Sequence, residues 1–158
     1  MQDEALEYVG FWARVGASIL DAVLTGCITV PLLAAVYGRA YFESTKMIMG
    51  PADALISWVL PAAAIILFWL KKQATPGKMA VYARVVDAAT GKTMSPGQAI
   101  GRYLAYFVAA LPFGVGLFWV AWDPKKQGWH DKLAGTVVIR AKKRTAQSAQ
   151  FNTNESGA

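Results

Sequence analysis

The sequence predicts an all-α membrane protein with two transmembrane helices, a third helical region broken by Pro and Gly, and a small cytoplasmic β element. Three observations lead to this fold class. Residues 15–37 and 54–70 are long apolar stretches, and residues 100–122 form a third. Hydrophobic residues make up 55% of the 158-residue chain and charged residues only 16%. Because this balance is far more apolar than that of a soluble domain of this size, membrane residence explains it best.

The first predicted span, residues 15–37, would be about 34 Å long as a helix, which is enough to cross a bilayer. Asp21 is the only charge within it, and Arg14 directly precedes it. A spacing of seven residues closes two helical turns, so Arg14 and Asp21 share one face with Ser18 and Thr25. An aspartate inside hydrocarbon costs roughly 2.5–3.5 kcal/mol, so Asp21 must face protein, a cation or water. It is therefore a candidate functional residue.

The second predicted span, residues 54–70, is shorter and contains Pro61. It ends at Lys71 and Lys72, charges that stop an apolar segment. Residues 38–53 carry mixed charges and are interpreted as an external connection, which places both termini in the cytoplasm. The first residues lack the features of a signal peptide, so the first span is expected to remain as an anchor.

A small sheet is predicted from two β-prone segments outside the membrane. Residues 79–87 are rich in valine, and a turn signal follows them. Residues 137–140 are also β-prone and pair with the first segment if both are cytoplasmic. Between them, residues 95–98 (SPGQ) form a capping box that starts a helix carrying Arg102 and Tyr103 in its early turns.

The third apolar region, residues 100–122, allows two interpretations. It is long enough to cross once, but residues 111–116 (LPFGVG) break it in the middle. Basic residues lie on both sides of it, and the positive-inside rule assigns both groups to the cytoplasm. A hairpin of two short helices on the cytoplasmic side satisfies this rule and is favoured. A single crossing stays open, because Pro and Gly also occur within genuine spans.

The remaining composition narrows the function further. Residues 1–140 are interpreted as the membrane domain, and residues 141–158 as a basic and polar disordered tail. The net charge is +6, but the basic residues cluster beside the apolar spans, which indicates membrane anchoring rather than nucleic-acid binding. Cys27 is the only cysteine, so an internal disulfide is excluded.

Several motifs in this order resemble the RDD family of small bacterial membrane proteins, named for one arginine and two aspartates. They are Gly10-Phe11-Trp12-Ala13-Arg14 leading to Asp21, Thr75-Pro76-Gly77-Lys78 followed by Arg84-Val85-Val86-Asp87, and Asp123-Pro124 through Gln127-Gly128 to residues 130–136. The resemblance covers about residues 8–140. It implies an inner-membrane protein of poorly understood role, sometimes associated with cation/proton exchange. Arg14 and Asp21 take the first two named positions, and Asp131 the third, with Asp123 as the alternative.

Together these observations predict a polar cluster on the cytoplasmic side, made of Arg14, Asp21, Arg102, Asp123, His130 and Asp131. Asp21 is either a proton or cation carrier, or a structural partner of Arg14, Arg102 or Lys78. Asp131 either forms a proton relay with His130, or forms a turn or helix cap.

Two functions follow from this cluster. The first is a transport component for a proton, a small cation or a small solute, which requires a homo-oligomer because two or three crossings give too little wall. The second is a non-catalytic adaptor or assembly factor whose sheet and basic tail bind a partner protein or anionic lipid. A single histidine and scattered carboxylates make a zinc site, a cofactor and an enzymatic activity unexpected.

Overall fold

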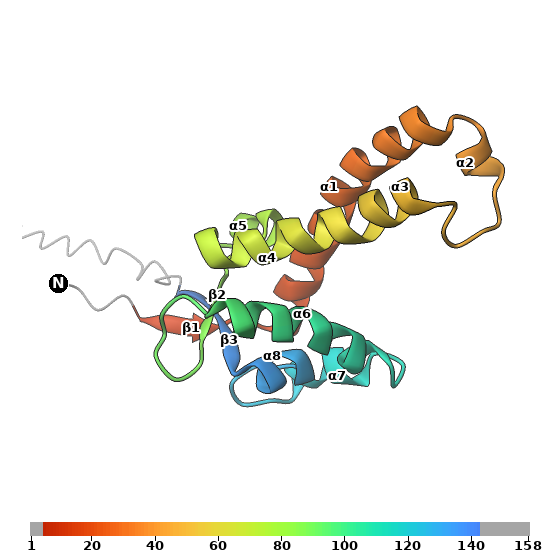
Figure 1. Ribbon diagram of the computed structural model, residues 1–158. Helices are drawn as coiled ribbons and strands as arrows, with labels where there is room; N and C mark the ends of the chain where they lie inside the picture. Colours follow the sequence, from red (N-terminus) through yellow and green to blue (C-terminus); the bar gives the residue numbers. More distant parts are fainter. Residues whose placement is uncertain (1–4, 143–158) are drawn as a thin grey trace, which may run out of the picture.

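The computed structural model describes residues 5–142, so the predicted tail lies almost entirely outside the described residues. Two long helices, α1 (Phe11–Tyr37) and the helix from Pro51 to Lys72, project together from the rest of the chain (Figure 1). Both are long and apolar enough to cross a membrane. Their surfaces carry many exposed large apolar side chains, among them Ile19, Ile28 and Leu67. This is the pattern expected of helices that face lipid.

Helix α1 begins four residues earlier than predicted, at Phe11, so Arg14 belongs to its first turn. Gly10 adopts an extended conformation and precedes the helix. Pro31 lies inside α1, yet the helix continues to Tyr37. Such continuity is common in membrane helices, where freed backbone groups find other partners.

The second long helix consists of α3 (Pro51–Ala54), a π-helical segment η1 (Leu55–Val59) and α4 (Leu60–Lys72). The amide of Leu60 donates to the carbonyl of Leu55, five residues earlier. Pro61 follows directly and has no amide hydrogen of its own. A π turn at this point is a known way to accommodate such a gap in the hydrogen-bond ladder. Helix α2 (Ala40–Glu43) lies in the connection from α1.

The sheet has three antiparallel strands in the order β1-β3-β2: β1 (Leu6–Tyr8), β2 (Arg84–Asp87) and β3 (Thr136–Ala141). Residues 84–87 pair with residues 136–139, which confirms the predicted pairing of the two β-prone segments. The prediction of strand from Met79 was wrong. Thr75 and Pro76 start a short helix, α5 (Pro76–Ala80), because proline favours the first position of a helix. The sequence did not predict β1, a three-residue strand.

The third apolar region is divided as predicted. Helix α6 (Pro96–Ala110) starts at the capping box, in which the Ser95 hydroxyl accepts from the Gln98 amide and the Gln98 side chain accepts from the Ser95 amide. The chain then turns through 114° into α7 (Val115–Phe118) and a 3-10 turn, η2 (Trp119–Ala121). This region adds a third candidate span only if the bent pair crosses as one unit.

The main core lies where the sheet, α4 and α6 meet, and helix α8 (Trp129–Ala134) packs against α6 close by. Gly135 ends α8 in the left-handed conformation and leads directly into β3. The buried core side chains are Val9, Trp69, Ala83, Val85, Met94, Ala99 and Val138. This core fixes the ends of both long helices to the sheet.

Candidate functional site

The centre of the polar cluster is the carboxylate of Asp131 on α8, which is completely buried. Its Oδ2 atom lies 2.6 Å from Nη1 of Arg14 on α1, and its Oδ1 atom lies 2.5 Å from Nη1 of Arg102 on α6. The backbone amide of Gly128 also donates to Oδ2, at 3.0 Å. We call Arg14, Arg102 and Asp131 the Asp131 centre. It joins three helices whose sequences are far apart.

The two arginines extend the centre to other parts of the chain. Arg14 donates from Nε to the carbonyl of Val9 at 3.0 Å and from Nη2 to the carbonyl of Lys126 at 2.5 Å. Arg102 donates to the hydroxyl of Thr136 at the start of β3. All three contacts hold backbone or side chains of neighbouring segments, so the arginines act as structural clamps.

Aromatic rings cover the rest of the Arg102 guanidinium. It lies 5.2 Å from the ring centre of Trp69 and 5.8 Å from that of Tyr106, within the range of cation–π attraction. Its Nε and Nη2 atoms have no hydrogen-bond partner within the described part of the chain. A fully buried cation with incomplete hydrogen bonding depends strongly on its carboxylate partner.

Electrostatics hold Asp131 in one charge state. Burial by itself would raise the pKa of Asp131, but the Arg102 and Arg14 guanidinium groups lower it by more. The pKa is therefore well below its usual range, and the carboxylate stays ionised at neutral pH.

His130 is next to this centre and stays neutral. Its Nε2 atom lies 3.5 Å from Oδ2 of Asp131, and its ring stacks on Tyr106 with the ring centres 4.0 Å apart. Burial lowers the pKa of His130 to about 3, although Asp131 raises it. A proton relay through His130 and Asp131 is not favoured by this arrangement, because each group keeps a single protonation state near neutrality.

The neutral state of His130 predicts a pH dependence of stability. The unfolded chain binds a proton near the ordinary histidine pKa of 6.5, whereas the folded chain binds it only near 3. The contribution of His130 to the free energy of unfolding is therefore fully present above pH 6.5. It falls as the pH decreases toward 3, by at most about 1.4 kcal/mol per pH unit. Unfolding in detergent between pH 7.5 and 4.5 measures this slope. The variant His130→Gln should lower the slope, and an unchanged slope would contradict the assignment.

Asp21 lies apart from the Asp131 centre. Its carboxylate accepts from the hydroxyl of Thr75 at 2.5 Å and from the amide of Gly77 at 2.6 Å. Among the described residues it forms no ion pair within 4.0 Å, so the predicted pairing with Arg14, Arg102 or Lys78 is not formed. Seven helical residues separate Arg14 and Asp21 by about 10 Å along the axis, which explains why their side chains find different partners.

Gly77 explains how closely α5 approaches α1 at Asp21. A Cβ atom at this position would lie 2.0 Å from the carbonyl oxygen of Ala17 and 2.9 Å from Cγ of Asp21. Only glycine leaves room for the amide of residue 77 to reach the carboxylate. Asp21 therefore anchors the start of α5 against the first long helix.

Asp123 also lies outside the centre. It pairs with Lys132 at 2.5 Å and accepts from the amides of Lys125 and Gln127, both at 3.1 Å. The Lys132 hydrogen bond holds the pKa of Asp123 below its usual range. This carboxylate stabilises the turn before α8. Of the six predicted residues, the structure thus brings together Arg14, Arg102, His130 and Asp131.

The sequence analysis did not identify Tyr106 and Thr136 as site residues, and it considered Lys78 only as a partner for Asp21. Tyr106 follows Arg102 by four residues on the same face of α6, and this spacing was the available signal. Thr136 had no local signal, because its partner Arg102 is 34 residues away. Within the described residues, no group of three or more His, Cys, Asp or Glu side chains could hold a metal ion.

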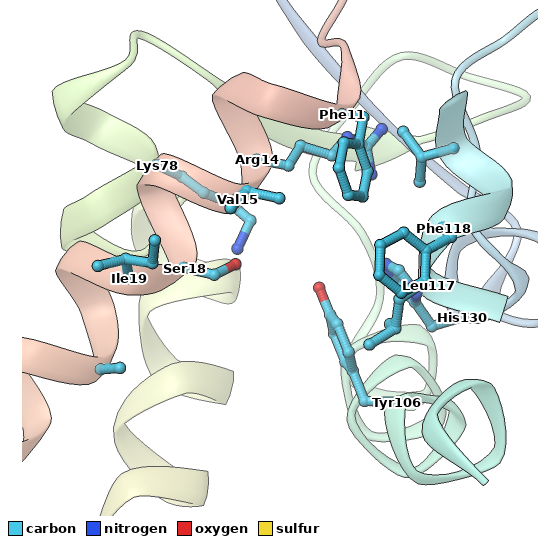
Figure 2. Close-up of a pocket in the computed structure, with 12 residues that line it drawn as sticks. Phe11, Arg14, Val15, Ser18, Ile19, Lys78, Tyr106, Leu117, Phe118 and His130 are labelled. Atoms are coloured by element: carbon cyan, nitrogen blue, oxygen red, sulfur yellow. The ribbon is translucent and has the colours of Figure 1, made fainter. Parts of the chain in front are cut away.

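Two cavities border the predicted site residues: the first is lined by Arg14 and His130, and the second by Asp21. One has a volume of about 380 Å³ and lies between α1, α6 and α7, with mainly apolar walls. The other, of about 540 Å³, lies between α1, α4 and α6 and includes Asp21 and the hydroxyls of Thr25 and Thr29. Both are lined by Ser18, Ala22, Lys78 and Tyr106. Figure 2 shows the first cavity with several of these side chains around it.

The fold is the one expected of a small helical membrane protein: two helices are long and apolar enough to cross a membrane, and a buried arginine–aspartate centre and a small sheet lie at one end of them. The model of the RDD family matches residues 8–135, and the chain belongs to this family. Residues Arg14, Asp21, Arg102 and Asp131 all lie within the matched range.

Similar proteins carry little functional information. The chain is 41% identical to the uncharacterized protein RP437 of Rickettsia prowazekii over 76 residues, which are 48% of this chain and 42% of that protein. It is 29% identical to the uncharacterized protein YxaI of Bacillus subtilis over 146 residues, 82% of this chain and 95% of that protein. A proline-rich antigen of Mycobacterium leprae is 29% identical over 52% of this chain and 35% of the antigen. No solved structure matches the chain.

Proposed function

We propose that this RDD protein is a non-catalytic adaptor or assembly factor of the bacterial inner membrane, which binds a partner protein through the outer face of its sheet. The observation that favours an adaptor over a transporter is that the Asp131 carboxylate already has all its partners within the protein. The carboxylate is bound to two guanidinium groups and an amide, and it stays ionised. Charges that hold the fold in this way are not free to load and release an ion.

The outer face of the sheet is the surface offered to the partner. Val85 and Val138 form a cross-strand pair that is fully buried on the core side. The opposite side of the sheet carries Leu6, Tyr8, Arg84, Ile139 and Ala141 as its accessible residues, and we call these the outer face; Val86 and Val137 lie on the same side but are buried. Leu6 is 60% and Tyr8 44% exposed. Exposed apolar side chains around one arginine suit a partner surface that is apolar with an acidic residue opposite Arg84.

Site-specific photo-crosslinking in cells tests this proposal. A photoreactive side chain at Leu6 or Tyr8 should give one discrete adduct with a second protein, and Arg84→Glu should weaken it. The same side chain at Phe113, which is 99% exposed in the turn between α6 and α7, is the matched control. Equal adducts from all three positions would contradict the proposal, as would proton-coupled cation flux by the purified protein alone.

A second candidate function is transport of a proton or small cation by a homo-oligomer. The cavity of about 540 Å³ favours it, because Asp21 and the hydroxyls of Ser18, Thr25 and Thr29 offer oxygen ligands there. Lys78 lines the same cavity, and its positive charge opposes cation binding. If Asp21→Asn retains normal flux in reconstituted vesicles, Asp21 is not the carrier.

We also propose that the sheet and both termini face the cytoplasm, as the distribution of basic residues indicates. Cysteine labelling in intact cells measures this orientation. Cys27 is exposed and is first replaced by alanine. In that background, Lys46→Cys between α2 and α3 should react with an impermeant reagent added outside, and Lys92→Cys should not. The opposite pattern would reverse the topology.

A further inference from the structure

Lys78 is a buried cation that the Asp131 centre does not use. It is 6% exposed and lines both cavities. Its one hydrogen bond within the described residues is a long one, 3.5 Å from Nζ to the hydroxyl of Thr75, and no carboxylate there lies within 4.0 Å of it. A buried ammonium group without a close counter-ion is costly, so an anionic ligand would stabilise it.

The charge balance around the cavities points the same way. The buried or partly buried cations are Arg14, Arg102 and Lys78. The buried or partly buried carboxylates are Asp21 and Asp131, and His130 is neutral. Three cations face two carboxylates, so one positive charge is unbalanced. Asp131 is already shared by the two arginines, and Asp21 is bound to Thr75 and Gly77. The unbalanced charge therefore resides at Lys78.

Polar atoms gather around this charge, and apolar walls extend from it. In Figure 2 the nitrogen of Lys78 and the oxygens of Ser18 and Tyr106 are directed toward the same space. The cavity of about 380 Å³ continues from there along apolar side chains, among them Val15, Ile19, Leu117 and Phe118. A cation and two hydroxyls at one end and hydrocarbon along the rest match an amphiphile with an anionic head.

The position along the long helices selects the kind of amphiphile. Lys78 follows the end of α4 at Lys72 by six residues, and Arg14 lies in the first turn of α1. Arg14 marks the end of the first apolar span, close to the level of phospholipid headgroups, and Lys78 lies about one to two turns farther along α1, because its neighbour Gly77 packs against Ala17 and Asp21. Basic pockets between membrane helices at this level are suited to anionic headgroups. We infer that an anionic phospholipid binds here, with its phosphate at Lys78 and one acyl chain along the cavity of about 380 Å³.

Native mass spectrometry of the purified protein tests this inference without any partner protein. The probes are phosphatidylglycerol and phosphatidylcholine of equal chain length, offered in equal amounts. The wild type should retain one phosphatidylglycerol about tenfold more strongly than phosphatidylcholine, because the buried charge of Lys78 is little screened by solvent and favours a headgroup with a net negative charge. Lys78→Met should abolish the preference, whereas the exposed control Lys72→Met should keep it.

A second variant protects the test against a folding defect. Ala22 lines both cavities, and Ala22→Phe should fill part of the space and reduce retention of both lipids without changing any charge. Folding of each variant is checked by its melting temperature in lipid-free detergent. Equal retention of both lipids by the wild type, or a preserved preference in folded Lys78→Met, would overturn the inference. Full displacement of the lipid by millimolar inorganic phosphate would assign the site to a soluble anion instead.

Discussion

Replacing Asp131 with asparagine should destabilise the protein by about 3–5 kcal/mol, because it leaves Arg102 and Arg14 without their shared counter-ion. Arg102 is fully buried, and two of its nitrogen atoms already have no hydrogen-bond partner within the described chain. An amide is nearly the same size as a carboxylate, so the loss reports charge rather than volume. Unfolding by denaturing detergent in mixed micelles measures the change.

The matched control for Asp131 is the pair of Glu7 and Arg140, whose atoms are 2.5 Å apart. Both side chains are about one-third exposed, so solvent screens this pair and Glu7→Gln should cost at most about 1 kcal/mol. If Asp131→Asn costs no more than Glu7→Gln, the Asp131 centre does not hold the fold together. A double variant that replaces Asp131 and Arg102 with apolar residues should recover part of the loss.

Replacing Gly77 with alanine should be nearly as damaging, although it adds a single carbon atom. That atom would lie 2.0 Å from the carbonyl oxygen of Ala17, which belongs to the backbone of α1 and cannot rotate away. Helix α5 must therefore move off α1, and Asp21 loses its hydrogen bond from the Gly77 amide. We expect a cost at or above the upper end of the roughly 1–3 kcal/mol typical of overpacking.

Gly101 is the control for Gly77. It lies inside α6, and a Cβ atom there meets nothing within 4 Å. Gly101→Ala should be neutral or stabilising by up to about 1 kcal/mol, because alanine favours the helix. The melting temperature should fall for Gly77→Ala and should stay the same or rise for Gly101→Ala. A similar loss in both would show that the close approach of α5 to α1 is not the cause.

Features with local signals were predicted well from the sequence. The two long helices follow from apolar length alone, and α6 starts at Ser95 because the capping box needs only four adjacent residues. The break in the third apolar region follows from Pro112 and Gly114. Each of these elements is decided by residues close together in the chain.

Features that depend on distant partners were predicted less well. Arg14 and Asp131 were both identified as site residues, but they are 117 positions apart, and Arg14 was first paired with its neighbour Asp21. Strand β1 has three residues and forms only because β3 is beside it. Residues 79–80 are β-prone but become helical, because Thr75 and Pro76 provide a helix start and Asp21 binds it.

The order of the strands has a consequence for synthesis of the protein in the cell. Strand β3 lies between β1 and β2, so the first two strands do not pair with each other. Asp131, the counter-ion of Arg14 and Arg102, also lies in the last part of the described chain. Both long helices therefore emerge from the ribosome before either the sheet or the charge centre can close. Until residues 129–141 arrive, the nascent chain carries two unbalanced cations, and it is expected to depend on chaperones or be exposed to proteases during this interval.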